Sequence, residues 1–406
     1  MNPLSLSLAY LRAQKLASLL TLLLLSVGIA MLSLLLLLGD QLQSRLARDA
    51  AGWDLVIGAK GSPLQLVLSA VYQLDAPTGN IPLAQAQVWR EHPQVAEAVP
   101  LALGDSYRGY RIVGTEVAYA RHYAARPAQG RWWQAPMEAV LGAEVARRTA
   151  LSVGATLVGA HGLSGGSEHD HWPYRVVGVL APTGSVIDRL VLTDVASVWQ
   201  LHAALAGQED DNDHAHHDEP YEVQTAPREV TALLLRYRTP RAALTLPRMV
   251  NAQSALQAAA PAVEVTRLFR LLGVGFDVLR GFAFLLLLMA MLGLFAALSQ
   301  MLETRRYDLA LLRLLGASPI WLFGQVCLQA ALLTLGGLLL GLLLGHGAAE
   351  WLGQQQRPGE LALTGLTWTP QEAWLPPLAL LTGLVAALLP AWRAYRTDIA
   401  PALARG

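Results

Sequence analysis

The histidines of this chain gather in two short segments that also carry carboxylates, and that combination could bind a metal ion. The first segment contains His161, His169 and His171, with Glu168 and Asp170 between them. Imidazole and carboxylate groups are common ligands of Zn²⁺ and of other divalent first-row metals. The sequence therefore makes this segment a candidate zinc site.

The second histidine segment, residues 207–222, reads GQEDDNDHAHHDEPYE and contains His214, His216 and His217. Histidine-rich tracts often bind metal, so this segment is a second candidate. The alternative is a solvated acidic loop that chelates metal only incidentally. Neither spacing defines a tetrahedral site, and the two segments would have to converge to form one.

Motifs for catalysis and for nucleotide binding are missing from the sequence. It contains no G-x-S-x-G and no H-E-x-x-H, and Glu138 and Glu144 are better interpreted as flanking a turn or helix start than as an acid/base pair. A phosphate-binding loop needs G-x-x-x-x-G-K-[ST], but the only lysines, Lys15 and Lys60, do not lie in one. The sequence thus predicts a chain that is not an enzyme.

A charged segment, residues 303–320, separates two apolar runs at residues 281–302 and 321–345, neither of which contains Asp, Glu, Lys or Arg. A helix that crosses the hydrocarbon core needs about 20 apolar residues, so the segment must connect two membrane spans. Its arginines place it on the cytoplasmic side by the positive-inside rule. The simplest interpretation is a cytoplasmic loop whose charges only set topology. The residues singled out in this segment are Glu303, Arg305, Arg306, Asp308, Arg313 and Gly316.

Two further apolar runs complete a predicted set of four spans. Residues 1–40 hold a cytoplasmic amino end and the first span, which is longer than the core of about 7–15 residues in a cleaved signal peptide, the competing interpretation. Residues 346–372 form an outer loop, residues 373–392 the fourth span, and residues 393–406 a basic cytoplasmic tail. No span carries Asp, Glu, Lys or Arg, which argues against an ion route and favours helices that relay motion.

The third span contains Gly337, Gly341 and Gly345 at positions i, i+4 and i+8. Small residues at this spacing let another helix approach the backbone closely. The partner helix could belong to the same subunit or to a neighbouring one.

Residues 41–280 differ from the rest of the chain. They hold most of the charged residues, are interrupted by Gly, Pro and Trp, and contain no run long enough to span a membrane. Short β-like runs alternate with helical ones, among them a helix predicted over residues 240–258 with a break near Pro247. The predicted fold is four transmembrane helices with an α+β extracytoplasmic domain inserted between helices 1 and 2.

Composition agrees with this class. Hydrophobic residues make up 53% of the 406 residues, charged residues 15%, and the mean hydropathy is +0.37, which is typical of a membrane protein. The net charge is +0 and no basic stripe is evident, so no nucleic-acid partner is expected. The only cysteine, Cys327, lies in an apolar run, which excludes an internal disulfide.

The charged segment resembles the cytoplasmic connection after the second span of MacB/FtsX-type ABC permeases, because residues 303–318 read E-x-R-R-x-D-x-A-x-L-R-x-L-G-A-S. The end of the chain is similar to the terminal motif of the same family, although Ile399 stands where that family has a proline. The matching residues there are Pro390, Ala391, Arg393, Ala394, Arg396, Ala402 and Leu403.

This resemblance implies the permease subunit of an ABC transporter complex in the inner membrane, with both chain ends in the cytoplasm and the large domain in the periplasm. It further implies a homodimer, a separate cytoplasmic ATPase that binds ATP, and a secreted or periplasmic partner. The six residues singled out in the charged segment would form the surface that couples to the ATPase.

Three interpretations of function stay open at this level. The histidine clusters resemble zinc-responsive ABC systems whose secreted partners are histidine-rich, so transport could be linked to zinc. An FtsX-like protein would instead transmit ATP-driven motion to an extracytoplasmic hydrolase without transport. A membrane-anchored metal sensor or chaperone is the third possibility.

Overall fold

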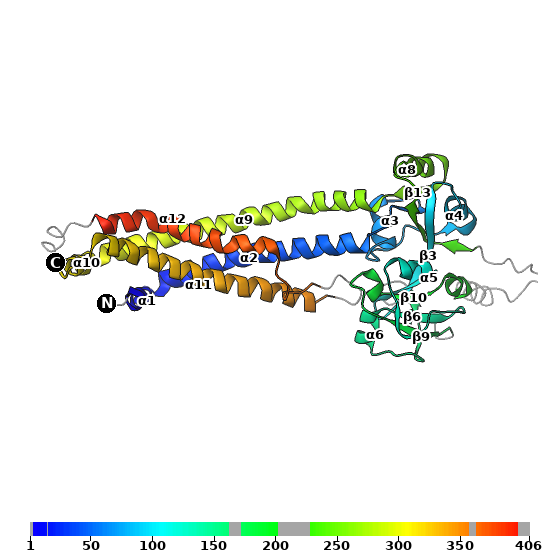
Figure 1. Cartoon of the computed structure of the whole chain (residues 1–406), viewed down its shortest axis with the longest axis horizontal. Helices are drawn as coiled ribbons and strands as arrows, with labels where there is room; N and C mark the ends of the chain where they lie inside the picture. Colours follow the sequence, from blue (N-terminus) through cyan, green and yellow to red (C-terminus); the bar gives the residue numbers. More distant parts are fainter. Residues whose placement is uncertain (1–2, 14, 162–171, 202–227, 357–362, 397–406) are drawn as a thin grey trace, which may run out of the picture. The chain divides into compact units, whose positions relative to one another are not determined.

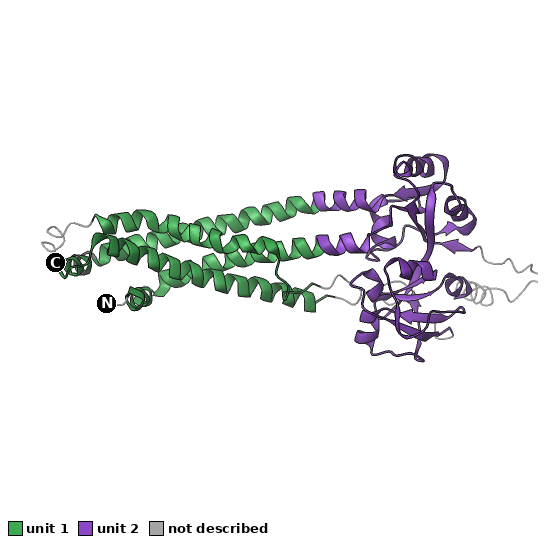
Figure 2. Ribbon diagram, viewed as in Figure 1, with its two compact units in different colours: residues 1–42, 272–356, 362–406 green, residues 43–271, 357–361 purple. Residues whose placement is uncertain are grey.

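The computed structural model describes residues 3–13, 15–161, 172–201, 228–356 and 363–396. It divides into two compact units, coloured separately in Figure 2. Unit 1 comprises Met1–Leu42, Leu272–Gln356 and Ala362–Gly406, and unit 2 comprises Gln43–Leu271 and Arg357–Leu361.

Unit 1 is built from helices (Figure 1), and within its described residues four helical stretches are long and apolar enough to cross a membrane. They are α2, α9, α11 and the stretch from η2 through α12. Two further short helices, α1 and α10, accompany them. The bounds are α1 Pro3–Ala13, α2 Lys15–Asp49, α9 Pro261–Thr304, α10 Arg306–Leu314, α11 Pro319–Gln354, η2 Pro370–Trp374 and α12 Leu375–Tyr395.

Leucine and alanine side chains hold these helices together in two apolar clusters. Leu25 and Ile29 of α2 pack with Leu287 of α9 in one cluster. Leu298 of α9 packs with Leu322 of α11 in the other. The remaining faces of the long helices carry exposed apolar side chains, as lipid contact requires.

The three glycines of α11 lie against α2 of the same chain. A Cβ at Gly341 would come within 2.7 Å of the Ile29 Cβ, and one at Gly345 within 2.9 Å of the Ala30 carbonyl oxygen. Gly337 meets Leu25 even more closely. The absence of side chains at every fourth residue is therefore what allows α2 and α11 to pack so closely.

Unit 2 contains an eleven-stranded mixed sheet with the order β13-β1-β12-β3-β4-β10-β6-β9-β5, to which β7 and β8 add at β9 and β3. A separate pair is formed by β11 and β2. Among the described strands, β10–β4 and β6–β9 pair in parallel, and the other ladders are antiparallel. The strands are β1 Leu55–Ala59, β2 Ile81–Pro82, β3 Val95–Tyr107, β4 Tyr110–Thr115, β5 Pro127–Gly130, β6 Glu138–Leu141, β7 Thr156–Leu157, β8 Ala160–His161, β9 Tyr174–Leu180, β10 Val191–Asp194, β11 Glu229–Val230, β12 Ala232–Tyr237 and β13 Leu256–Ala259.

Two hydrophobic cores lie on this sheet. One packs Leu55 and Leu235 under Leu246 of α8, and the other packs Ile112 and Leu141 beside α6. The long strand β3 belongs to both halves, because it pairs with β12 along its first part and with β4 along its second. Helices of unit 2 whose bounds lie within the described residues include α3 Pro63–Ala70, α4 Leu83–Arg90, α5 Val117–His122, α6 Ala143–Thr149, η1 Val186–Arg189 and α8 Ala242–Gln253.

The helix predicted over residues 240–258 is wrong in two respects. Pro247 lies inside α8 without breaking it, because the buried face Ala242, Leu246 and Val250 keeps its spacing around the proline. The last residues of the predicted helix belong instead to β13, which pairs with β1. Sheet pairing thus overrides the helix preference of an alanine-rich segment.

Candidate functional site

The charged segment between α9 and α11 contains a distinct short helix, α10, and a local break separates it from α9. Arg305 takes φ −119° and ψ 22° at this break, so the helical path ends at Thr304 and restarts at Arg306. The carbonyl of Arg305 accepts a hydrogen bond from the Leu309 backbone N–H at 3.0 Å. The change of direction is therefore set by one residue.

The carboxyl end of α10 is closed by a Schellman motif. Gly316 has φ +100°, a left-handed conformation that L side chains rarely adopt. Its N–H donates to the Arg313 carbonyl at 3.1 Å, and the Ala317 N–H donates to the Leu312 carbonyl at 3.0 Å. The left-handed backbone conformation thus explains why a glycine occupies this position.

The next helix begins immediately afterwards. The Ser318 hydroxyl accepts a hydrogen bond from the Trp321 N–H at 3.2 Å, and Pro319 occupies the first turn. Serine before proline is a favourable helix start. The G-A-S sequence therefore ends one helix and starts the next within three residues.

The two faces of α10 differ. Leu309 and Ala310 are buried, and Leu309 belongs to the apolar cluster that includes Leu322. Leu311, Leu314 and Leu315 are exposed. Because they stand at i, i+3 and i+4, they form one apolar stripe, which was not among the residues singled out from the sequence. The helical spacing of these leucines was the signal that could have found it.

The polar residues of the segment lie in different surroundings. The Arg305 guanidinium lies 4.1 Å from the centroid of the Tyr10 ring, a cation–π contact with α1. Glu303 is exposed and Arg313 is half-buried. Arg306 and Asp308 belong to α10, but the placement of their side chains lies outside what the structure describes.

Helix α1 supports this region and was not predicted as a helix. The Gln325 side-chain amide of α11 donates to the Ser7 hydroxyl at 2.7 Å and to the Pro3 carbonyl at 3.1 Å. Tyr10 is buried beneath Arg305. The start of the chain is thereby fixed to the same helices that flank α10.

The residues predicted to bind metal lie almost entirely outside the described structure. His161 ends β8, where its backbone is in register with Asp105 of β3, and its side chain is not described. No group of three or more metal-ligating side chains occurs within the described residues. The others, His169, His171, His214, His216 and His217, fall in the gaps at 162–171 and 202–227.

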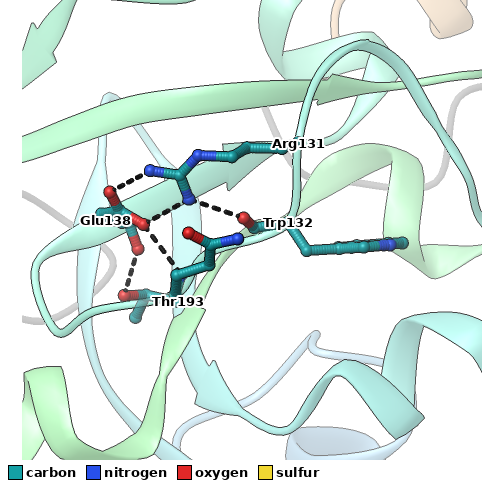
Figure 3. A network of polar contacts seen from close by, with 5 residues as sticks. Arg131, Trp132, Glu138 and Thr193 are labelled. Atoms are coloured by element: carbon teal, nitrogen blue, oxygen red, sulfur yellow. Dashed lines mark hydrogen bonds and ion pairs between the residues drawn. The ribbon is translucent and has the colours of Figure 1, made fainter.

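Glu138 and Glu144 are each engaged with an arginine of their own. Glu138 accepts two hydrogen bonds from Arg131, at 2.5 and 2.8 Å, and one from the Gln134 N–H at 2.8 Å (Figure 3). The Arg131 hydrogen bonds and the Gln134 N–H lower the pKa of Glu138 to about 2. Glu144 pairs with Arg148 one turn along α6 at 3.1 Å. A carboxyl group with so low a pKa is a poor proton donor near neutral pH.

Comparison with known families identifies both parts of the chain. The profile of the MacB-like periplasmic core domain matches residues 18–236, and that of the FtsX-like permease C-terminal domain matches residues 280–399. The chain therefore belongs to the MacB/FtsX family of ABC transporter permeases. It is a membrane protein with an extracytoplasmic domain, and this family works with a cytoplasmic ABC ATPase.

Two solved structures are similar to part of the chain. The periplasmic region of MacB from Actinobacillus actinomycetemcomitans has 9% sequence identity and a TM-score of 0.33, with coverage of 54% of this chain and 95% of that one. The extracellular domain of the noncanonic ABC-type transporter YknZ from Gram-positive bacteria has 11% sequence identity and a TM-score of 0.29, with coverage of 50% of this chain and 98% of that one. No curated protein matched the chain.

Proposed function

We propose that this chain couples ATP hydrolysis by a separate ATPase to movement of an extracytoplasmic domain inserted between the first and second spans. The observation that carries this proposal is the exposed apolar stripe of α10, formed by Leu311, Leu314 and Leu315. An amphipathic helix that lays such a stripe into a groove is a recurring mode of protein recognition. The groove would belong to the ATPase, which also holds the ATP.

The supports of α10 suit it for transmitting force. The Schellman motif at Gly316 joins it to α11 through a single residue, Ala317, before the Ser318 cap. Arg305 joins it directly to α9. Because both connections are short and hydrogen-bonded, displacement of α10 would move the ends of both spans rather than be absorbed in a loop. Glu303, Arg306, Asp308 and Arg313 would surround the stripe with charge.

The orientation follows from the arginines. Those of the α10 segment and those of the tail, Arg393 and Arg396, would lie on the cytoplasmic side of the inner membrane. Both chain ends would then be cytoplasmic and the large domain periplasmic, where it could meet a secreted partner. Two copies of the chain would act as a homodimer, and since Gly337, Gly341 and Gly345 face α2 of their own chain, the subunit interface would use other helix faces.

The test is a pair of matched leucine substitutions. Leu314→Glu should abolish copurification of the ATPase from detergent-solubilised membranes, because a charge enters the apolar stripe. Leu4→Glu changes an exposed leucine of α1 and should leave copurification intact. Arg306→Glu should uncouple ATP hydrolysis from the outer domain while membrane insertion persists. Unchanged copurification of the ATPase with Leu314→Glu, together with normal coupling in Arg306→Glu, would refute the proposal.

Signalling without transport is the second candidate function, and the match of residues 280–399 to the FtsX-like profile favours it. In this case the moving domain would regulate an extracytoplasmic hydrolase. Copurification with a cell-wall hydrolase, together with unchanged substrate levels after deletion of the gene, would select signalling over transport.

A zinc-linked system or a metal sensor would depend on the two histidine segments. Substituting His214, His216 and His217 with Ala should weaken zinc binding by the full chain, and substituting His161, His169 and His171 tests the other segment in the same way. Unchanged zinc affinity would remove the metal role of the segment concerned.

A further inference from the structure

Four large apolar side chains are exposed where α11 meets α12. Trp351 lies near the end of α11, Leu366 and Trp368 lie in the segment before η2, and Trp374 ends η2 directly before α12. Leu366 is 82% exposed and Trp368 is 68% exposed. Large apolar side chains exposed in one region of the chain indicate an interaction surface.

The backbone that carries these side chains is fixed by buried hydrogen bonds on one side. The Gln41 amide bonds Thr364 twice, since its Nε2 donates to the Thr364 carbonyl at 2.6 Å and its Oε1 accepts from the Thr364 N–H at 3.0 Å. The Glu350 carboxylate accepts from the Gly365 N–H at 3.0 Å, and the His346 Nδ1 donates to the Gly365 carbonyl at 2.6 Å. Helices α2 and α11 therefore both hold the segment just before Leu366 in place.

A buried carboxylate fixes the other side. Glu372 is almost fully buried and accepts hydrogen bonds from the Ser33 hydroxyl at 2.6 Å and from the Thr369 N–H at 3.0 Å. Its Oε1 also lies 3.0 Å from the His346 Nε2. The Trp368 ring packs on His346 with 4.4 Å between the ring centroids. Leu366 and Trp368 are thus held in place with their outer surfaces uncovered.

A matching aromatic group marks the other end of α12. Trp392 and Tyr395 are exposed there, and 18 residues separate Trp392 from Trp374. At 1.5 Å per helical residue this distance is roughly 27 Å, close to the thickness of about 30 Å of the hydrocarbon core. Between the two groups α12 exposes Leu380, Leu381, Leu384, Val385, Leu388 and Leu389.

We infer that Trp351, Leu366, Trp368 and Trp374 form an interfacial anchor that inserts into the headgroup region of the leaflet on the α11–α12 connection side. The occupant of this surface is the bilayer, because Trp374 directly precedes α12, which exposes an apolar side, and tryptophan favours the membrane–water interface. Residues 363–374 carry no Lys or Arg, so the anchor binds through apolar insertion and does not require anionic lipid. The anchor requires only that the chain is embedded in a membrane, and not that it couples to an ATPase.

The test uses the fact that Cys327 is the only cysteine. In a Cys327→Ser background, a nitroxide label on Leu366→Cys is compared with one on Gln355→Cys, an exposed polar position that caps α11. The full chain is reconstituted in phosphatidylcholine vesicles, and collision with oxygen, which concentrates in lipid, is compared with collision with a water-soluble nickel chelate.

The anchor predicts a reversed preference between the two positions. The label at 366 should collide mainly with oxygen, and the label at 355 mainly with the nickel chelate. Adding anionic lipid should change neither result. A label at 366 that is as accessible to nickel as the one at 355 would overturn the inference, and so would one shielded from both reagents, which would indicate that a second copy or another protein covers the surface.

Discussion

Two arginine–carboxylate pairs of unit 2 have the same chemistry in opposite surroundings. Arg189 and Asp49 lie 3.1 Å apart, with side chains only 6% and 4% exposed. Arg131 and Glu138 lie 2.5 Å apart, with side chains 45% and 16% exposed. The exposed pair lowers the pKa of its carboxyl group to about 2 through direct hydrogen bonds, yet each partner remains accessible to water if the other is removed.

The comparison teaches that burial, rather than distance, decides what an ion pair does. Breaking the buried pair would leave a buried charge without its ion-pair partner, whereas breaking the exposed pair only returns two groups to solvent. Asp49 ends α2 and Arg189 lies in η1, so the buried pair also ties the last turn of a long helix to the sheet domain. We expect mutations to follow this order of burial.

The largest effect is expected from Arg189→Leu. It leaves the Asp49 carboxylate buried and unpaired, which should lower the free energy of unfolding by about 3–5 kcal/mol. The measurement is the thermal unfolding midpoint of the full chain in detergent. The double variant Asp49→Leu/Arg189→Leu should recover most of the loss, and a double variant as unstable as the single one would show that shape rather than charge is responsible.

An intermediate effect is expected from Glu372→Gln in unit 1, where a buried carboxylate faces a hydroxyl, an N–H and a histidine instead of an arginine. The amide can accept fewer of these hydrogen bonds and turns its NH₂ group toward a donor, which should reduce stability by about 1–3 kcal/mol. Hydrogen exchange at the Thr369 amide should accelerate. The neighbouring exposed variant Gln371→Ala is the control and should leave this exchange rate unchanged.

A smaller, pH-dependent effect is expected from Glu138→Gln. Because the folded pKa of about 2 lies below the unfolded value of about 4.3, the stabilisation by Glu138 is fully present above the unfolded pKa and is lost as the pH falls toward 2. Solvent screening limits the contribution to about 1 kcal/mol or less. Urea unfolding at pH 7 and pH 3 should show a smaller pH difference in the variant than in the wild type, and an equal difference would contradict this role.

The smallest effect is expected from Arg236→Gln. Arg236 pairs with Glu97 at 3.1 Å, and the two side chains are 50% and 31% exposed. The free energy of unfolding, obtained from the shift of the unfolding midpoint, should change by no more than about 0.5 kcal/mol. A loss comparable to that of Arg189→Leu would break the proposed dependence on burial.

Sequence patterns predicted the parts of the fold that are decided locally. The long apolar runs indicated four helices able to span a membrane, and such helices are present in the described residues. The turn after α10 is just as local, because the left-handed conformation of Gly316 and the Ser318 cap set its geometry. Such features depend on backbone conformation and neighbouring side chains.

Features that depend on distant partners escaped prediction. The strand β3 reads VAEAVPLALGDSY, which has no regular alternation and contains Pro100, a residue that argues against a central strand. Its pairing with β12 comes from residues more than a hundred positions away. The leucine stripe of α10 was missed for another reason, because apolar residues beside a span resemble a continuation of that span.

The position of β1 in the sheet has a consequence for the order of events during synthesis. The core around Ile112 and Leu141 is contributed by residues between Tyr110 and Val191, so it can form from a single stretch of chain. Val56 of β1, in contrast, pairs with Leu234 and Ala259, which are made much later. The apolar strand β1 therefore stays unpaired while most of the domain is completed, and we expect nascent chains that stop before β12 to need a chaperone to avoid aggregation.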